Sequence, residues 1–425
     1  MSNKGKSTAE AGSGAALVPK LRFPEFQDAG AWETAPGDVL FQQVSNREAP
    51  PGLPILAITQ EHGAIPRHMI DYHVSVTDKS LETYKEVRTG DFIISLRSFQ
   101  GGIEFSDYHG ICSPAYVILR KRGRLSDTFY RQHFKSHDFI QQLTRNLEGL
   151  RDGKMISYKQ FSELQLLKPC LPEQQKIADC LASADALTEA QGRKVEALNA
   201  HKKGLMQQLF PQEGETQPRL RFPEFEAAGE WEERHLESLA KRGSGHTPSK
   251  SKPEYYDGGV KWISLADSKR LDNGLISETE VEVSAEGIKN SSAVLHKAGS
   301  VLISRDAGIG KSAVMALPMA VSQHFIVWTC DDRKLSNWFL YHLLQQSKPL
   351  FDRAATGSTI KTIGLQFFVD LRFRIPSRLE QQRIADCLNS LDGLITAEAR
   401  KLDTLKTHKK GLMQQLFPQV GEDDA

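Results

Sequence analysis

Two segments of the chain, 172–211 and 379–418, carry apolar residues at alternating spacings of four and three. The seam positions are Ile177, Leu181, Ala184, Thr188, Gln191, Val195, Leu198, Lys202, Leu205 and Leu209 in the first segment, and Ile384, Leu388, Leu391, Ile395, Glu398, Leu402, Leu405, Lys409, Leu412 and Leu416 in the second. This spacing is typical of a coiled coil, and so narrow a seam is unstable when it faces water alone. We therefore expect two long helices that pack together within the chain, and an antiparallel pair gives pseudo-twofold symmetry.

The regions before each helix predict a different kind of structure. Short β-branched and aromatic runs predict strands, for example at 91–95 and 324–328, whereas 126–151 and 336–350 have helical spacing. We interpret the chain as α/β, in the mixed α+β sense, with two globular domains. The expected order is a disordered tail at 1–18, a first domain at 19–171, the first helix at 172–211, a second domain at 218–378 and the second helix at 379–418.

The chain also repeats itself once, with an offset far above the period of solenoid arrays. Residues 19–26 read Pro-Lys-Leu-Arg-Phe-Pro-Glu-Phe, and residues 218–225 read Pro-Arg-Leu-Arg-Phe-Pro-Glu-Phe. The helical segments match as well, from 173–212 to 380–419, and both end in the same twelve residues. The domain regions differ from each other far more than these flanks do. This contrast suggests two modules that perform the same kind of function on different targets. The alternative is that the sequence of one copy has diverged without a change of target.

Composition limits the classes of partner. Lys and Arg number 54 against 53 Asp and Glu, so the formal net charge is only +1 and a nucleic acid must be met by local patches. The sequence contains no apolar run long enough to span a bilayer. Its five cysteines are scattered without a C-x-x-C pair, which argues against a disulfide framework or a zinc site and fits a reducing cytoplasm.

No complete catalytic motif is present in the sequence. Residues 308–312 are similar to the end of a phosphate-binding loop, but Arg305 stands where that loop needs its first glycine. The G-x-S-x-G, H-E-x-x-H and Asn-Pro-Pro-Tyr types of motif are absent, and so is a glycine-rich cofactor fingerprint. We therefore expect the chain to be non-catalytic by itself and to hold no metal.

The order of the motifs, given twice, carries a family resemblance over nearly the whole chain. The matching stretches are 19–26, 153–158 leading into 171–178, 218–225, 243–249, 305–312 and 379–385. In these stretches the chain resembles the specificity subunit of type I restriction-modification enzymes.

The resemblance implies two target-recognition domains, each reading one half of a split DNA sequence. It also implies that the two helices set the gap between the half-sites and dock two modification subunits. Those subunits would bring S-adenosylmethionine and adenine methylation, while restriction subunits with a motor and a nuclease would bring ATP and magnesium. Two other interpretations remain open: a coiled-coil scaffold that joins two protein-binding modules, and a specificity subunit of another multisubunit restriction system.

Candidate DNA contacts are polar or basic residues on turns next to predicted strands. The alternative interpretation of each such residue is that it is a solvated loop residue without a DNA contact. We select Arg97, Ser98, Gln100, Lys154 and Tyr158 in the first domain, and Lys250, Lys252, Arg305, Lys311, Ser312 and Lys361 in the second.

Candidate partner contacts lie in the repeated flanks. They are Phe23, Phe26 and Trp32 with their repeats Phe222, Phe225 and Trp231, and Lys202, Gln207, Lys409 and Gln414 on the helices. The aromatic residues can anchor either against a helix end or against a modification subunit, and the helix residues can equally be solvated surface.

Overall fold

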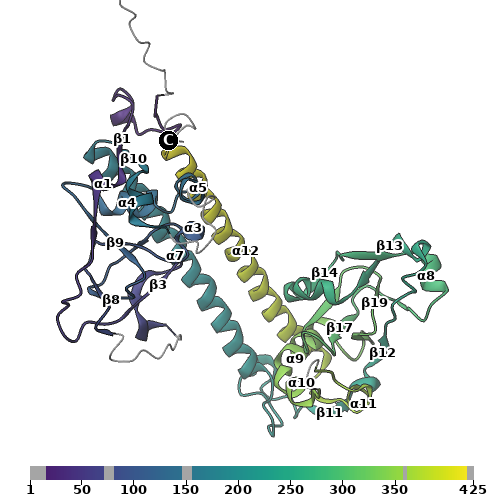
Figure 1. Cartoon of the computed structure of the whole chain (residues 1–425). Coiled ribbons are helices and arrows are strands. Elements are labelled where there is room, and N and C mark those ends of the chain that lie inside the picture. The colour runs from purple at the N-terminus through teal and green to yellow at the C-terminus, as the bar shows by residue number, and fades with distance from the viewer. Residues whose placement is uncertain (1–15, 71–80, 146–155, 358–360, 419–425) are drawn as a thin grey trace, which may run out of the picture. The chain divides into compact units, whose positions relative to one another are not determined.

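The computed structural model describes residues 16–70, 81–145, 156–357 and 361–418 (Figure 1). The chain divides into two compact units, of which unit 1 contains residues 1–191 and 401–425 and unit 2 contains residues 192–400. Helices α7 (Leu171–Leu209) and α12 (Arg378–Leu416) each contribute to both units. Each unit therefore consists of one mixed domain and parts of both long helices.

The domain of unit 1 is built on an antiparallel four-stranded sheet in the order β2-β9-β6-β7, which α4 covers through its buried aromatic face. Smaller two-stranded sheets pair β1 with β10, β3 with β4 and β5 with β8. The strands are β1 (Glu33–Pro36), β2 (Phe41–Val44), β3 (Leu56–Thr59), β4 (Gly63–Pro66), β5 (Lys85–Val87), β6 (Phe92–Ile94), β7 (Glu104–Phe105), β8 (Gly110–Cys112), β9 (Val117–Lys121) and β10 (Gln165–Lys168). The helices are α1 (Gly37–Leu40), α3 (Ser98–Gly101), α4 (Asp127–His133), α5 (His137–Arg145) and α6 (Tyr158–Ser162), with short 3-10 turns at Pro24–Phe26 and Arg67–Met69.

The domain of unit 2 has a five-stranded sheet in the order β12-β20-β17-β18-β14 and a four-stranded sheet in the order β15-β13-β19-β16. The strands are β11 (Glu232–His235), β12 (Ala240–Ser244), β13 (Tyr256–Ile263), β14 (Leu275–Ile276), β15 (Val281–Val283), β16 (Leu295–His296), β17 (Val301–Ser304), β18 (Ser312–Met315), β19 (Met319–Val321), β20 (Phe325–Cys330) and β21 (Arg372–Ile375). The helices are α8 (Ala285–Lys289), α9 (Asn337–Gln346), α10 (Lys348–Ala354) and α11 (Leu365–Val369), with 3-10 turns at Pro223–Phe225, Leu236–Ser238, Pro253–Tyr255 and Leu265–Asn273.

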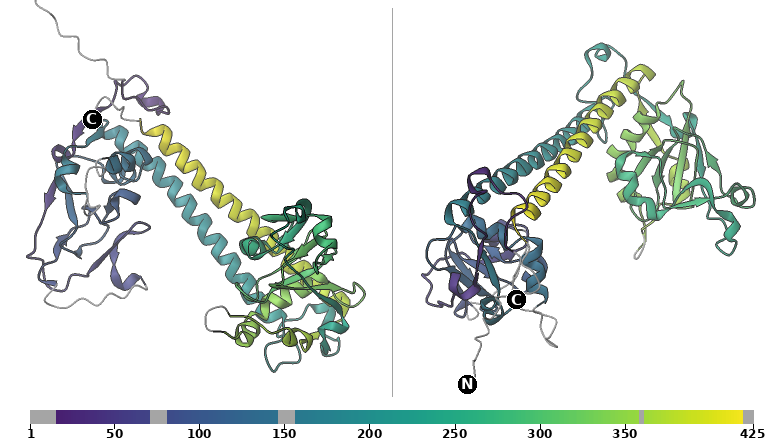
Figure 2. Two further views of the ribbon diagram at one scale, coloured as in Figure 1. Left: turned by 45° about the vertical axis from the view of Figure 1, so that its right-hand side comes forward. Right: turned by 90° about the horizontal axis from the view of Figure 1, so that it is seen from above.

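The two long helices pair in opposite directions, as expected from the sequence (Figure 2). In unit 2, Lys194 Nζ lies 2.5 Å from Glu398 Oε1 and Lys202 Nζ lies 2.5 Å from Asp392 Oδ1, so residue numbers rise along one helix as they fall along the other. In unit 1, Lys409 Nζ lies 2.5 Å from Asp185 Oδ1. The predicted seam positions are all buried or half-buried, whereas most residues between them are exposed. Lys202 and Lys409 thus bind the neighbouring helix.

The core of each domain is completed by the end of the helix that belongs to the other repeat. In unit 1, the ring of Phe417 at the end of α12 lies 5.4 Å from the ring of Phe129 on α4. In unit 2, the ring of Phe210 at the end of α7 lies 5.5 Å from that of Phe339 on α9. Both phenylalanines of the helix ends are at most 2% exposed.

The repeated flanks bind the starts of the helices through buried ion pairs. The Arg22 guanidinium donates to both carboxylate oxygens of Glu173 on α7 at 2.7 and 2.9 Å, and Arg221 does the same to Glu380 on α12 at 2.7 Å to each oxygen. All four side chains are at most 8% exposed. The repeated Arg-Phe-Pro-Glu-Phe motif is therefore a structural joint between domain and helix.

The glutamines that follow these glutamates make a second repeated joint. Gln174 Oε1 accepts from the backbone N–H of Ser126, which caps α4, at 3.0 Å, and Gln381 Oε1 accepts from the backbone N–H of Ser336, which caps α9, at 2.9 Å. These contacts show that α4 in the first domain is equivalent to α9 in the second, with Ser126 at the position of Ser336 and Phe129 at the position of Phe339.

Of the helices in the described residues, none has the length and apolarity that a membrane crossing requires.

Candidate nucleic-acid interface

Three loops of the second domain meet beside the ends of β17 and β20. The backbone N–H of Arg305 donates to His324 O at 3.0 Å, the N–H of Ile363 donates to Arg305 O at 2.9 Å, and Arg305 Nε donates to Ile363 O at 3.0 Å. These bonds hold residues 305–306, 323–324 and 362–363 together. We call the polar side chains gathered there the second-domain rim: Thr247, Arg305, Asp306, Gln323, His324 and Thr362.

A chain of hydrogen bonds runs through this rim. Thr247 Oγ1 donates to Gln323 Oε1 at 2.7 Å, and Gln323 Nε2 lies 3.5 Å from His324 Nε2. His324 Nδ1 lies 2.5 Å from Asp306 Oδ2, and the hydroxyl of Thr362 donates to the other oxygen of Asp306. Because the carboxylate can only accept, neutral His324 carries its proton on Nδ1 and accepts at Nε2. These hydrogen bonds hold the side chains of the rim in one arrangement. A surface that is ordered before binding loses less conformational entropy when a ligand binds.

The structure places two of the predicted cations of the second domain at this rim, namely Arg305 and Lys361, which directly precedes Thr362. Arg305 belongs to it, while Lys250 and Lys361 are exposed and form no ion pair with the described residues. Lys311 is less available, because its Nζ donates to Asp272 Oδ2 at 2.8 Å and to Ser268 O at 3.1 Å. Lys252 Nζ lies 3.0 Å from the hydroxyl of Tyr255. Their contacts with DNA stay predictions.

In the first domain, Arg97 and Gln100 are exposed at α3, and Gln60 Nε2 donates to Arg97 O at 3.1 Å. The hydroxyl of Tyr158 donates to Phe41 O at 3.1 Å, which turns this residue toward the core. Lys154 lies outside the described residues. Arg97 and Gln100 remain the accessible predicted contacts on this domain.

Two predicted contacts are wrong for this structure because their side chains are buried. Ser98 is 1% exposed and its Oγ accepts from the backbone N–H of Ser95 at 2.9 Å. Ser312 is fully buried and its Oγ accepts from Gln345 Nε2 at 2.7 Å. Both hydroxyls support their own loop or strand, so neither can reach a base.

The predicted aromatic partner contacts also need correction. Trp32 and Trp231 are 5% and 1% exposed and belong to the domain cores. The half-buried rings of Phe23 and Phe222 bind cations at the helix starts, with Lys176 Nζ 5.6 Å from the ring centre of Phe23 and the Arg383 guanidinium 4.7 Å from that of Phe222. These four residues anchor helix ends. Phe26 and Phe225 are half-buried, and Gln207 and Gln414 are exposed, so their binding to a partner stays a prediction.

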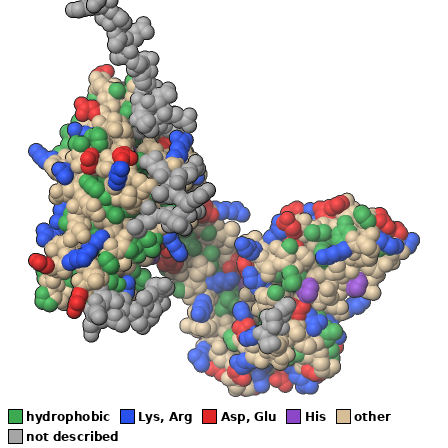
Figure 3. All heavy atoms as spheres, in the orientation of Figure 1, with side chains coloured by type: hydrophobic (Ala, Val, Ile, Leu, Met, Phe, Trp, Pro, Cys, Tyr) green, Lys and Arg blue, Asp and Glu red, His purple; other side chains and the backbone are tan. Residues whose placement is uncertain are grey.

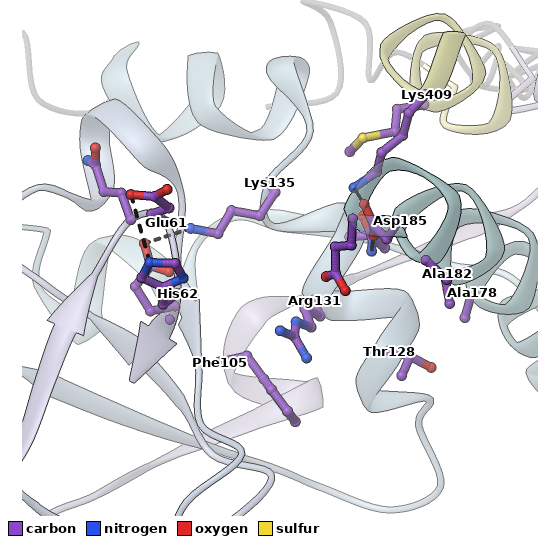
Figure 4. Close-up of a pocket in the computed structure, with 17 residues that line it drawn as sticks. Glu61, His62, Phe105, Thr128, Arg131, Lys135, Ala178, Ala182, Asp185 and Lys409 are labelled. Atoms are coloured by element: carbon purple, nitrogen blue, oxygen red, sulfur yellow. Dashed lines mark hydrogen bonds and ion pairs between the residues drawn. The ribbon is translucent and has the colours of Figure 1, made fainter. Parts of the chain in front are cut away.

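A groove of about 600 Å³ lies within unit 1 between the first domain and the long helices (Figure 4). The view shows Lys409 reaching from α12 to Asp185 on α7, and Lys135 reaching toward the side of the groove that carries Glu61 and His62. Lys135 Nζ lies 2.6 Å from Glu104 Oε1, and burial raises the pKa of this carboxyl although Lys135 opposes the shift. Among the described residues, no group of His, Cys, Asp and Glu is arranged to hold a metal ion.

The two domains present different side chains at equivalent places of one scaffold. Asp91 pairs with Arg120 where the second domain joins Ser300 to Thr329. Matching the sheets on this contact places Leu96 where the second domain has Arg305, Arg97 where it has Asp306, and Ala115 where it has His324. On the face shown in Figure 3, Lys and Arg alternate with Asp and Glu over both units, in keeping with the net charge of +1. Any specificity therefore lies in local sets of residues such as the rim.

The sequence prediction did not include Asp306, Gln323 or His324. Gln323 and His324 form a polar pair directly before β20, whose first four residues are buried, and this abrupt change was the available signal. The rim joins residues between 247 and 362, and such a network cannot be found from spacing along the chain.

Comparison with known proteins identifies this architecture. Residues 228–407 match the family model described as the type I restriction modification DNA specificity domain. The chain is 23% identical over 361 residues to the type I restriction enzyme MjaVIII specificity subunit of Methanocaldococcus jannaschii, an alignment that covers 81% of both proteins.

Solved structures share the fold. One is from a type I R-M system studied for its assembly and conformational transition; it has a TM-score of 0.59 at 17% identity and covers 92% of this chain and 98% of its own. The S subunit of a type I restriction-modification system from M. genitalium has a TM-score of 0.55 at 14% identity, with 95% and 100% covered. Residues 228–407 thus match a DNA specificity domain. Over most of its length, the chain is similar to specificity subunits of type I restriction enzymes.

Proposed function

We propose that the chain is the DNA-recognition subunit of a type I restriction-modification complex, with each domain reading one half of a split target. The observation that carries this proposal is the difference between the two domains at equivalent places, such as Arg97 against Asp306 and Ala115 against His324, on one scaffold that binds the helices in the same way. Two domains that share a frame and differ at an exposed edge are suited to reading two different sequences.

The physical mechanism separates affinity from discrimination. Exposed cations such as Lys250 and Lys361 contact phosphates and orient the domain, while side chains such as Arg97 contact base edges in the major groove. Because the helices tether the domains, binding of the second half-site is intramolecular and two modest affinities multiply. Discrimination then requires both half-sites in one DNA molecule.

The proposal extends to partners. Two modification subunits dock on this chain, because its repeated joints and helices offer two equivalent surfaces, and restriction subunits complete the complex. S-adenosylmethionine, ATP and magnesium bind to those subunits, and this chain is non-catalytic by itself. The deoxyribonuclease and adenine methyltransferase activities belong to the assembled complex in the cytoplasm.

The test is to express the chain with its modification subunit and to map methylated adenines across the genome. A split methylated motif is the expected result. If methylation does not change and the complex is not retained on DNA at physiological salt, the chain is instead a scaffold that joins two protein-binding modules.

A further inference from the structure

Gln323 lies at the centre of the second-domain rim, with its side chain exposed. Its neighbours Ser322 and Phe325 are at most 1% exposed, and the backbone N–H of Ser322 donates to Ile263 O at 2.9 Å. The backbone that presents Gln323 is therefore held by a buried strand. Its amide lies between Thr247 on one side and His324 on the other.

The orientation of this amide follows from its partners. In the neutral tautomer that donates from Nδ1 to Asp306, His324 accepts at Nε2, and the group 3.5 Å away is then the N–H of Gln323. The hydroxyl of Thr247 donates to the other end, Gln323 Oε1, at 2.7 Å. A threonine hydroxyl can donate or accept, so the Thr247 contact is compatible with the orientation that the His324 contact sets.

A carboxamide has two N–H donors and two oxygen lone pairs. The rim uses one of each, so one donor and one acceptor remain side by side at the surface. Adenine presents the complementary pair in the major groove, with N7 as acceptor and N6 as donor, whereas guanine presents two acceptors there. Fixing the amide in advance removes much of the ordering cost of such a contact.

We propose that Gln323 reads an adenine in the half-site of the second domain, and that Thr247, His324 and Asp306 are its positioning residues. The inference rests on the proposed function and adds the base that is read. Arg305 and the exposed Lys361 lie beside the same loops and can contact the flanking phosphates. The equivalent place in the first domain holds Pro114, followed by Ala115, so the first half-site is read by other residues.

The decisive variant is Gln323→Ala, tested in the complex with the modification subunit. We expect methylome sequencing to show that one position of the second half-site no longer requires adenine, while the first half-site is unchanged. Affinity for the original target falls by about 5- to 150-fold, the equivalent of one bidentate base contact. Gln366→Ala is the matched control, because Gln366 is exposed in the same domain but its amide donates to Asp370.

Thr247→Val tests the positioning. Removing the hydroxyl donor frees the amide to rotate, so we expect methylation at sites with other bases in that one position, with Gln323 intact and an unchanged melting temperature. A melting temperature that falls together with methylation at all sites would assign Thr247 a structural role instead.

The outcomes separate the two proposals. If the wild-type complex gives a split motif and Gln323→Ala keeps the same second half-site, the reading of adenine by Gln323 is overturned and the proposed function stands. A uniform loss of affinity across sequences would make Gln323 a phosphate contact and would also overturn it. If the wild-type complex gives no split motif, the proposed function itself fails.

Discussion

Arg221 and Glu380 form one of the two buried ion pairs that join a domain to the start of a long helix. The guanidinium also donates to Ala228 O at 2.7 Å, so the contact fixes the turn of the flank as well as its attachment. A buried pair of this kind contributes little net stability compared with apolar packing, but removal of one partner leaves an uncompensated charge. The pair therefore specifies where the domain attaches.

Arg221→Met should lower the free energy of unfolding by about 3 kcal/mol, because Glu380 stays buried without its partner. Lys348→Met is the control, since its pair with Asp352 is about half exposed and should contribute less than about 1 kcal/mol. Denaturant unfolding measures both. Adding Glu380→Gln to Arg221→Met should recover part of the loss, and no recovery would contradict the charge argument.

His133 gives unit 1 a pH dependence. Its ring is buried among Phe129, Phe139 and Phe417, neither ring nitrogen has a hydrogen-bond partner among the described residues, and burial lowers the pKa of His133 to about 3. Since the unfolded chain takes up this proton below about pH 6.5, unfolding becomes more favourable as the pH falls from about 6.5 toward 3.

His133→Leu should flatten the loss of stability between pH 6.5 and pH 4. Leucine is the natural choice because Leu343 occupies the equivalent place in the second domain. The measurement compares unfolding midpoints of the variant and the wild type at pH 7.5 and pH 4.5. An equal loss in both proteins would show that other groups cause the acid sensitivity.

At this scale the sequence predicted residue types better than side-chain directions. Lys250, Lys361, Arg97 and Gln100 are exposed as a DNA contact requires. Ser98 and Ser312 were equally plausible from their neighbours in sequence, but their side chains point inward, which depends on tertiary packing.

Among the elements, the long helices were the most predictable. Their alternating spacing is local, and the observed bounds, Leu171–Leu209 and Arg378–Leu416, lie within two residues of those expected from Pro172 and the Phe-Pro stops. Strands such as β6 and β20 were also marked by their composition. The order of strands within each sheet was not predictable, because it depends on pairing between segments far apart in the chain.

The helix pair allows a test of the gap between the half-sites. Gly192 and Ala399 lie opposite each other near the ion pair of Lys194 with Glu398, so four residues inserted after both positions preserve the pairing on either side. The insertion adds about 6 Å of helix, or about two base pairs at about 3.4 Å each. We expect methylome sequencing to show a longer gap with both half-sites unchanged. Altered half-sites with the original gap would contradict a spacer role.

For the whole molecule, the duplication predicts that the half-sites can be changed independently. Arg97→Ala should weaken binding only to DNA that carries the first half-site, because Arg97 lies in unit 1 and the rim lies in unit 2. Gel-shift titration with each half-site mutated in turn measures this. An equal loss on all sequences would make Arg97 a phosphate contact.

The exchange of helix ends between the repeats has a consequence for biosynthesis. Phe417, which closes the core of the first domain, follows the whole second domain in the sequence. During translation the first domain therefore keeps an open apolar face until α12 has been synthesised. The second domain has its helix end, Phe210, in place before its own strands emerge. The first domain is therefore completed only after the second domain has been synthesised, and termination before Phe417 leaves its core open.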